Sequence, residues 1–439
     1  MNVVDYQSSP GNTVVGDITV PGDKSISHRA LIFGSIARGT TTISGFLDAE
    51  DCLATMKAMQ SMGVTIEGPI GNRVVVHGVG KHGLKKPKDI INCGNSGTSI
   101  RLLAGLLVGQ PFDSVLDGDS SLRKRPMDRI SRPLLQMGAD ISTWEGRPPI
   151  TIRGSSSTLQ GITYEMPEAS AQVKSCLLIA GMYAEGENTV IDPGYTRDHT
   201  ERLLTAFSYP IQKSENRIVI NSEEECMGTD VIVPGDISSA AFFLVAATVV
   251  PGSDLIIRNV GINPTRTGIL QILKMMGADI QILNKRLCGE EPVADLHIRS
   301  AQLEGIDIPN SLVPYAIDEF PAIFIAAACA HGQTKLQGAR ELRVKESDRI
   351  AAMVEGLQQV GIEAIALEDG AIIRGGKIQG GEVHSFQDHR IAMAFAVAGS
   401  VATAPITIRD CANVRTSFPK FLEIAKQANL HIEGSESVS

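Results

Sequence analysis

Arginine and lysine side chains in this sequence gather in polar segments that precede apolar runs. The net charge is −9, so such groups would form local anion sites on an acidic protein. Guanidinium groups bind phosphate through paired hydrogen bonds. We therefore expect a site for a polyanion, although any one cation could instead be a solvated surface charge. The candidates are Lys24, Arg29, Arg101, Arg123, Lys124, Arg125, Lys174, Arg197, Lys345, Arg349 and Arg390.

Carboxylates occur in or near the same segments, at Asp48, Asp51, Asp318, Glu319 and Glu346. A carboxylate beside an ammonium group in a cleft is a candidate general acid or base. Asp318 could instead cap a helix. Glu346 could instead form a surface ion pair with Arg343 or Arg349.

The segment Val20–Ala37 contains the first of these cations. A strand-like ending turns at Pro21-Gly22, and an apolar helix follows. We expect Asp23-Lys24-Ser25 to offer capping side chains, with Ser25 or Ser27 able to accept from the free N–H groups of the first turn. The free N–H groups of its first turn and the helix dipole would favour an anion beside Lys24 and Arg29. A capped surface helix with solvated basic residues is the alternative.

The same pattern recurs six times, at intervals of about 70 residues. Each copy has a polar segment, an apolar helix, a β-branched strand, a second helix ending at Gly, Asn or Pro, and a further strand. The polar segments begin near Val20, Asn92, Pro167, Val233, Ile317 and Ser385. A helix that is apolar on every face must be buried on every face, so we expect helices inside and strands outside.

The sixth copy lacks a closing strand after Ile432, and Val14–Val20 is a strand without a copy of its own. We predict that Val14–Val20 closes the sixth copy. Residues 22–232 would then form one domain and residues 1–20 with 236–439 the other, with crossings near 21 and 234. The fold prediction is an α/β protein of two inside-out barrels with three units each. If the buried helices run parallel, their polar starts would line a cleft between the domains, with Pro21-Gly22 as half of a hinge.

Other features exclude several classes of protein. Gly78-Val-Gly-Lys-His-Gly83 matches a dinucleotide-binding pattern, but Leu84-Lys-Lys-Pro-Lys88 follows it instead of an apolar helix. The seven cysteines are scattered and no histidines have ligand spacing, so we expect reduced thiols and no metal site. An isoelectric point near 5.6 argues against nucleic-acid binding. The first ten residues predict no export signal, and no apolar run is long enough for a membrane span.

Several segments together closely resemble the 5-enolpyruvylshikimate-3-phosphate synthase family, across essentially the full chain. They are Gly22-Asp-Lys-Ser-Ile-Ser-His-Arg29, Gly94-Asn-Ser-Gly-Thr-Ser-Ile-Arg101, Arg123-Lys-Arg-Pro126, Ser170-Ala-Gln-Val-Lys174, Arg343-Val-Lys-Glu-Ser-Asp-Arg349 and Asp388-His-Arg390. Arg197-Asp-His-Thr-Glu201 and Asn263-Pro-Thr-Arg266 resemble the bacterial class II branch. The family fold is an inside-out α/β barrel of two threefold domains.

The resemblance implies transfer of enolpyruvyl from phosphoenolpyruvate to the 5-hydroxyl of shikimate 3-phosphate, with release of phosphate and without metal or organic cofactor. Carried over by position, shikimate 3-phosphate would contact Lys24, Ser25, Arg29, Ser170, Gln172, Arg197, Asp318 and Lys345. Phosphoenolpyruvate would contact Lys24, Gly97, Arg125, Gln172, Arg349 and Arg390. Glu346 and Lys24 would be the candidate acids and Asp318 the base.

The sequence departs from the family in one place. Many relatives have a lysine two residues before the final Phe-Pro, where this chain has Thr416, and the adjacent Arg415 is the candidate replacement. The alternatives in function are UDP-N-acetylglucosamine enolpyruvyl transferase and a non-catalytic anion-binding protein. The former usually carries a cysteine in the region of Asp117–Pro126, where this chain has none. We expect a cytoplasmic monomer.

Overall fold

The computed structural model describes residues 3–154, 158–194 and 196–437. The other eight positions, which the predicted domain ranges include, lie outside the described part. The chain divides into two compact units. We call Gly22–Val233 with Cys288–Glu290 the N-terminal unit, and Met1–Pro21, Pro234–Leu287 and Glu291–Ser439 the C-terminal unit. The assignment of Cys288–Glu290 to the N-terminal unit differs from the predicted continuous segment 236–439.

The N-terminal unit contains three four-stranded sheets, with strand orders β16-β3-β5-β4, β6-β7-β9-β8 and β11-β13-β15-β14, and the pair β10-β12. Its helices are α1 (Lys24–Ile36), α2 (Glu50–Ser61), α3 (Gly97–Leu107), α4 (Asp128–Gln136), α5 (Ala171–Gly181) and α6 (His199–Ala206), with the 3-10 turn η1 (Leu122–Lys124). Its strands are β3 (Arg38–Ser44), β4 (Thr65–Ile70), β5 (Arg73–Val79), β6 (Ile91–Asn92), β7 (Ser114–Asp117), β8 (Ile141–Trp144), β9 (Arg147–Ile152), β10 (Leu159–Gln160), β11 (Thr163–Glu165), β12 (Ala184–Glu185), β13 (Asn188–Ile191), β14 (Gln212–Ser214), β15 (Arg217–Ile220) and β16 (Asp230–Ile232).

The C-terminal unit also contains three sheets, with orders β2-β17-β19-β18, β20-β22-β21 and β23-β24-β1-β25. Its helices are α7 (Ile237–Val249), α8 (Gly268–Met275), α9 (Val313–Ala316), α10 (Phe320–Cys329), α11 (Arg349–Gln359), α12 (His389–Gly399) and α13 (Phe421–Gln427), with 3-10 turns η2 (Asn310–Leu312), η3 (Arg340–Val344) and η4 (Cys411–Thr416). Its strands are β1 (Val3–Ser9), β2 (Val15–Thr19), β17 (Asp254–Gly261), β18 (Asp279–Cys288), β19 (Glu291–Arg299), β20 (Gln333–Leu336), β21 (Glu363–Leu367), β22 (Gly370–Arg374), β23 (Gly381–His384), β24 (Ile406–Arg409) and β25 (His431–Ser437).

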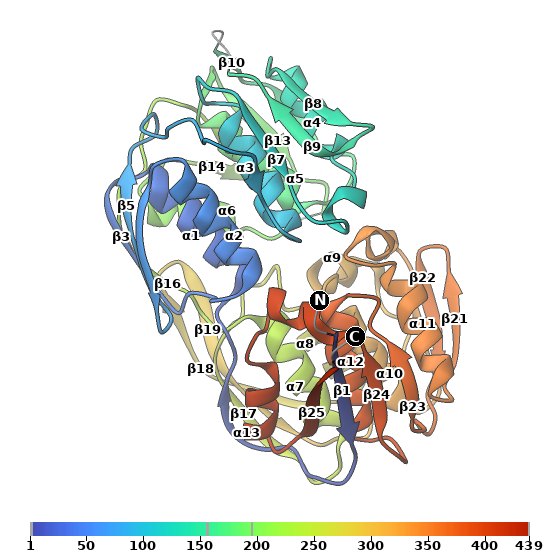
Figure 1. The fold of residues 1–439 in the computed structure, drawn as a ribbon. Coiled ribbons are helices and arrows are strands. Elements are labelled where there is room, and N and C mark those ends of the chain that lie inside the picture. The colour runs from blue at the N-terminus through green and yellow to red at the C-terminus, as the bar shows by residue number, and fades with distance from the viewer. Residues whose placement is uncertain (1–2, 155–157, 195, 438–439) are drawn as a thin grey trace. The chain divides into compact units, whose positions relative to one another are not determined.

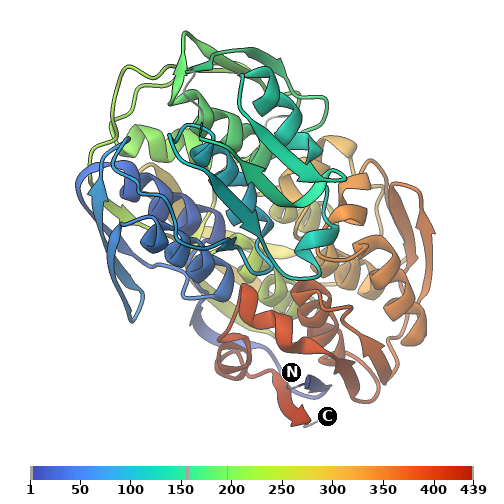
Figure 2. The same cartoon turned by 45° about the horizontal axis from the view of Figure 1, so that its top comes forward.

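The first helix of each copy lies at the centre of its unit, as predicted. α1, α3 and α5 contact one another in one core, and α7, α10 and α12 contact one another in the other. The sheets lie outside these helices in each unit (Figures 1 and 2). In α7 every side chain from Ile237 to Thr248 is buried. Gly105 lets α3 approach α5 closely, because a Cβ there would lie 2.2 Å from the carbonyl oxygen of Cys176. The helix-inside α/β fold is therefore confirmed.

These central helices begin earlier than their apolar runs. Of the predicted capping side chains, Asp23 caps α1 by accepting from the Ile26 N–H at 2.9 Å, whereas the caps predicted at Ser25 or Ser27 are wrong. Ser96, Ser170, Asp236 and Asp388 cap α3, α5, α7 and α12 in the same way. Side-chain caps stabilise a helix start upstream of the apolar residues. Many polar residues predicted in loops therefore lie in first turns.

The strands around residues 1–20 pair differently from the prediction. β2, within Val14–Val20, does not close the sixth copy but pairs in parallel with β17. β1 closes the sixth copy instead, because it pairs antiparallel with both β24 and β25. β16, which precedes the fourth copy, pairs in parallel with β3 of the first copy. The strands before the two Pro-Gly-Asp segments are thus exchanged between the first and fourth copies.

No helix in the described part of the chain is long and apolar enough to cross a lipid bilayer.

A buried ionic cluster joins α5 to α6 inside the N-terminal unit. The Lys174 ammonium lies 2.8 Å from a Glu201 oxygen and 3.2 Å from an Asp192 oxygen, with all three side chains almost fully buried. Burial raises the pKa of Asp192, but Lys174 and hydrogen bonds from Thr196 and Gly194 outweigh it and hold that pKa below its ordinary value. The cluster therefore stabilises the fold only while Asp192 is ionised.

This cluster generates a prediction about stability and pH. Asp192→Asn should lower the free energy of unfolding at pH 7 by about 3 kcal/mol, because it leaves a buried ammonium with one partner fewer. The pKa of Asp192 is depressed in the folded protein, so its contribution is fully present above the unfolded value, near 4. It is lost as the pH falls from there through the folded pKa.

Urea unfolding at pH 7 and at pH 3 measures this effect. The difference between parent and Asp192→Asn should be smaller at pH 3. Glu363→Gln, which removes the exposed partner of Arg374, is the control and should change little at either pH. An equal difference at both pH values would contradict the assignment.

Candidate active site

The starts of α1 and α2 bring two of the predicted cations into one network. The Lys24 ammonium lies 2.6 Å from an Asp51 oxygen. Arg29 is buried and donates to Thr200 Oγ1 at 2.7 Å, Ser175 Oγ at 2.6 Å and the Ser25 carbonyl at 2.9 Å. These bonds hold the guanidinium against α5 and α6.

The starts of α3 and α5 meet beside that network. Gln172 accepts a hydrogen bond from Arg101 and donates to Thr98 Oγ1 at 3.0 Å, which fixes its side-chain amide. Arg125 is buried and donates to Asn95 Oδ1 at 2.6 Å. Gly97 begins α3, and a Cβ there would lie 3.0 Å from guanidinium nitrogens of both Arg101 and Arg125. A side chain at that position would obstruct the access of a ligand to Arg125.

Three other predicted residues of the N-terminal unit lie at helix starts. Ser170 caps α5, and its Oγ accepts from the Val173 N–H at 3.4 Å. The O–H of Ser170 remains a donor in that role. Ser25 lies half-buried in the first turn of α1, and Arg197 lies half-buried just before α6. The predicted residues of this unit therefore gather at the starts of α1, α3, α5 and α6, together with the η1 segment.

In the C-terminal unit, Arg349 is the centre of a carboxylate cluster. Its guanidinium donates to Asp388 at 2.8 and 3.2 Å, to Glu346 at 2.7 Å and to Asp318 at 3.4 Å. Burial lowers the pKa of Arg349, but the carboxylates of Asp388, Glu346 and Asp318 raise it by more than burial lowers it. The guanidinium therefore stays charged. Burial raises the pKa of Asp388, but Arg349 holds it below its ordinary value.

Lys345 faces the same cluster, with its ammonium 3.5 Å from Asp318 and 3.6 Å from Glu341. Arg390 begins its helix half-buried, and its guanidinium has no ion pair or hydrogen bond within the described ranges. Asp318 caps no helix, because Glu319 occupies the N-cap position of α10. Glu346 pairs with Arg349, whereas Arg343 pairs with Asp348 at 2.6 Å. The helix-cap alternative for Asp318 is therefore wrong. Glu346 forms the predicted ion pair with Arg349, but the pair is not on the surface, because Arg349 is buried.

Three side chains from the initial candidate set form ion pairs or hydrogen bonds away from the residues described above. Lys174 lies in the buried cluster with Asp192 and Glu201. Arg123 is exposed and pairs with Asp117. Glu319 is 1% exposed and accepts from Ser238, with Arg266 at 3.7 Å. Lys174 and Glu319 are therefore buried in structural contacts.

Thr416, which stands where many relatives have a lysine, lies at the end of η4. Thr416 is buried, and its hydroxyl donates to the Asn413 carbonyl at 2.7 Å. Arg415 is exposed. Arg415 thus carries the only cationic side chain of η4.

Sequence reasoning missed the neutral residues that hold the cations. Thr200, Ser175, Thr98 and Asn95 each bond to a predicted site residue. Their sequence signal is weak, because Ser, Thr and Asn at helix starts indicate caps as often as partners of a guanidinium.

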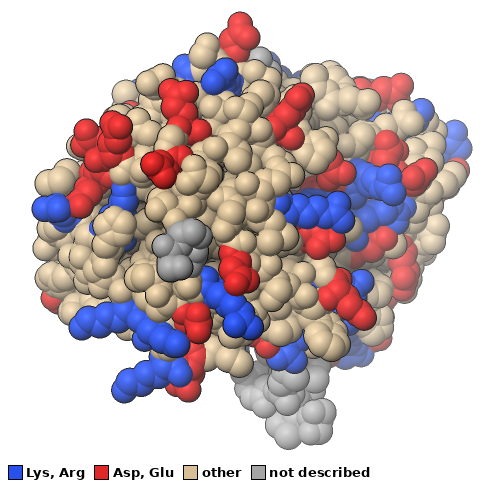
Figure 3. Space-filling model, turned by 90° about the horizontal axis from the view of Figure 1, so that it is seen from above, with Lys and Arg blue, Asp and Glu red and all other residues tan. Residues whose placement is uncertain are grey.

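The described residues contain no group of three or more His, Cys, Asp and Glu side chains arranged to hold a metal ion. On the surface that Figure 3 shows, lysines and arginines lie in small groups among acidic side chains. That face has no continuous basic surface of the kind that binds nucleic acid.

Comparison with known proteins gives one consistent result. The sequence model of the EPSP synthase (3-phosphoshikimate 1-carboxyvinyltransferase) family matches residues 8–424. A 3-phosphoshikimate 1-carboxyvinyltransferase of Legionella pneumophila is 65% identical over 98% of this chain and 99% of its own length. One from Methylococcus capsulatus is 59% identical over 98% of both chains. The structure of an EPSP synthase from Acinetobacter baumannii has a TM-score of 0.88 and 54% identity, and covers 99% of this chain and all of its own. This chain therefore belongs to the EPSP synthase family.

Proposed function

We propose that this chain is a 3-phosphoshikimate 1-carboxyvinyltransferase, which transfers enolpyruvyl from phosphoenolpyruvate to the 5-hydroxyl of shikimate 3-phosphate and releases phosphate. This reaction belongs to the shikimate pathway of aromatic amino acid biosynthesis. The family match over residues 8–424 supports it over both alternatives, UDP-N-acetylglucosamine enolpyruvyl transfer and non-catalytic anion binding. The observation that carries the chemistry is the cluster of Asp318, Glu346 and Lys345 around Arg349.

The substrate contacts in this proposal are those that the resemblance to the family implies. Shikimate 3-phosphate is held by Lys24, Ser25, Arg29, Ser170, Gln172, Arg197, Asp318 and Lys345. Phosphoenolpyruvate is held by Lys24, Gly97, Arg125, Gln172, Arg349 and Arg390, with Arg415 as a candidate for a further phosphate contact. The support is that carboxylates at 2.6 to 3.5 Å hold the ammonium groups of Lys24 and Lys345 and the buried guanidinium of Arg349 in place, so these cations are positioned before an anionic substrate binds.

The reaction proceeds by addition and elimination. Asp318 takes the proton of the 5-hydroxyl while the hydroxyl oxygen of shikimate 3-phosphate forms a bond to C2 of phosphoenolpyruvate. C3 gains a proton from Glu346 or Lys24, which gives a tetrahedral adduct. Loss of a C3 proton and cleavage of the C2–O bond to phosphate then restore the double bond. Lys345 and Arg349 lie 3.5 and 3.4 Å from one Asp318 oxygen, and this arrangement favours a carboxylate able to accept the proton.

We further propose that the protein acts as a monomer in the cytoplasm. All seven cysteines are free thiols in the structure. Burial raises the pKa of Cys176 and of Cys226 to about 12, so these thiols stay protonated and unreactive at neutral pH.

The two carboxylates provide the central test. Asp318→Asn and Glu346→Gln should each lower kcat by about 10² to 10⁴, the usual contribution of a general acid or base. Glu341→Gln is the matched control, because its carboxylate also faces Lys345, at 3.6 Å, without an assigned role. Phosphate release with shikimate 3-phosphate and phosphoenolpyruvate measures all four proteins.

The outcomes separate the function from the residue roles. Phosphate release by the parent supports the function, and its absence, or activity with UDP-N-acetylglucosamine instead, would contradict it. Turnover within about threefold of the parent in both carboxylate variants would contradict the assigned roles.

Arg390 provides a test of substrate assignment. Arg390→Gln should raise KM for phosphoenolpyruvate by about 10-fold or more, because a hydrogen bond to a charged group contributes about 1.5–3 kcal/mol. KM for shikimate 3-phosphate should change by less than about threefold. Arg374→Gln, at an exposed surface pair, is the control. Equal changes in both KM values would contradict a specific contact with phosphoenolpyruvate.

A further inference from the structure

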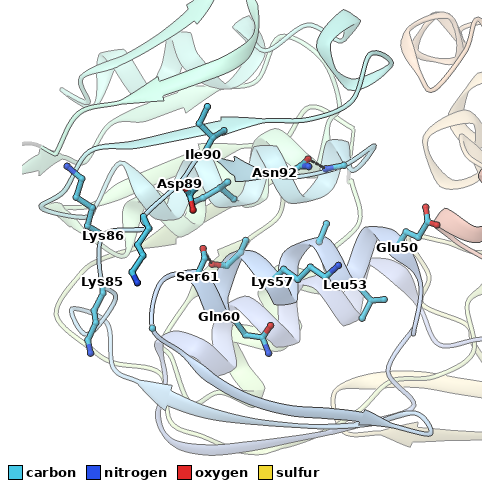
Figure 4. Close-up of a pocket in the computed structure, with 16 residues that line it drawn as sticks. Glu50, Leu53, Lys57, Gln60, Ser61, Lys85, Lys86, Asp89, Ile90 and Asn92 are labelled. Carbon is cyan, nitrogen blue, oxygen red and sulfur yellow. Dashed lines mark hydrogen bonds between the residues drawn. The ribbon is translucent and has the colours of Figure 1, made fainter. Parts of the chain in front are cut away.

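A groove of about 750 Å³ lies in the N-terminal unit, outside the residues assigned to either substrate. Figure 4 shows α2 as one wall and the segment from Lys85 to Asn92 as the other. This segment includes Lys85-Lys86-Pro87-Lys88, which the function described above does not use. The volume falls in the range of small-molecule sites, about 300–1,000 Å³.

The groove has a basic lining. Lys57, Lys85, Lys86 and Lys88 contribute to it, against two carboxylates, Glu50 and Asp89. Lys57, Lys85 and Lys88 have no ion pair among the described residues, and Lys86 has one, 3.8 Å from the exposed Asp113. The lysines in this groove carry like charges that repel one another, and an anion bound among them would relieve that repulsion.

The lysine segment is held against α2. The Lys85 N–H donates to the Met62 carbonyl at 2.8 Å. Pro87 is buried, and a Cβ on Gly63 would lie 3.0 Å from Lys85 Cδ. Lys85 lies at the C-terminus of α2, where the helix dipole favours a positive charge. This interaction does not account for Lys57 and Lys88.

Apolar side chains lie between the lysines. Leu53, Ala54, Ala58 and Ile91 line the groove, together with Ile90, which is 60% exposed. An exposed isoleucine beside three unpaired lysines suits a ligand with both an apolar body and negative charge.

This groove and the proposed substrate residues lie on different faces of α2. Glu50, Leu53, Ala54, Lys57 and Ala58 face the groove. On the opposite side of the same helix, Asp51 pairs with Lys24 and Thr55 bonds to His28 at 2.8 Å. We propose that the groove between α2 and Lys85–Asn92 is a second binding site, for a nucleotide-sized organic polyanion with an apolar or aromatic body.

ATP without metal is the probe, titrated into the full-length protein by calorimetry. We expect binding with Kd below about 1 mM. Lys57→Ala and Lys88→Ala should each weaken it by about fivefold or more, since each removes a charge-assisted contact. Ala54→Glu, which adds a carboxylate to the groove, should abolish it. Lys285→Ala and Lys377→Ala remove exposed lysines elsewhere and should change Kd by less than about twofold.

Two comparisons locate the ligand and define its chemistry. Arg390→Gln, in the proposed phosphoenolpyruvate site, should leave the affinity for ATP unchanged. Tripolyphosphate and adenosine should each bind at least about fivefold more weakly than ATP, because each has only half of the required chemistry. Turnover and unfolding midpoint should stay at parent values in the lysine variants, which shows that they fold.

The proposal would be overturned by no ATP binding up to about 5 mM. It would also be overturned by binding that survives Lys57→Ala, Lys88→Ala and Ala54→Glu, or that is lost in Arg390→Gln. Tripolyphosphate as tight as ATP would contradict the apolar half of the site.

Discussion

Burial of an apolar helix on every side is the constraint on which each unit depends. α7 has no polar face to offer a ligand, because all residues from Ile237 to Thr248 are buried. Along the central helices, only the first turns combine free N–H groups with polar side chains. Chemistry is therefore confined to the helix starts, and the caps that define these starts also decide which residues reach a ligand.

This placement has an electrostatic consequence. Cations at a helix start oppose the positive end of the dipole and need local compensation. Lys24 has Asp51 at 2.6 Å, and Arg349, 1% exposed, has three carboxylates. Arg29 instead donates to hydroxyl and carbonyl oxygens. Under the proposed function, the carboxylates that compensate these cations in the folded protein also move protons when substrate is bound.

The sequence was sufficient to predict the repeats, the central helices and the presence of many cations at helix starts. Periodicity and composition report burial directly, and each central helix is too apolar to lie anywhere else. The direction of a side chain was not predictable. Lys24 directly follows the capping residue Asp23, and Lys174 comes four residues after the capping residue Ser170. Lys174 turns into the core, where Asp192 and Glu201, distant in sequence, pair with it. The prediction of strand pairing was wrong for a similar reason. β1 and β2 are both short, and the strand with which each one pairs depends on its tertiary neighbours.

The start of α10 shows how one copy of a repeat becomes specialised. It lacks a side-chain cap, and Glu319 at that position is buried against Ser238 and Arg266 of the preceding copy. A buried carboxylate held in this way fixes the backbone at the start of the helix. Asp318, one residue earlier, then points to the other side, 3.5 Å from Lys345 and 3.4 Å from Arg349. Two adjacent carboxylates thus have separate surroundings: Glu319 is buried at the start of α10, and Asp318 lies beside Lys345 and Arg349, where we propose that it accepts a proton.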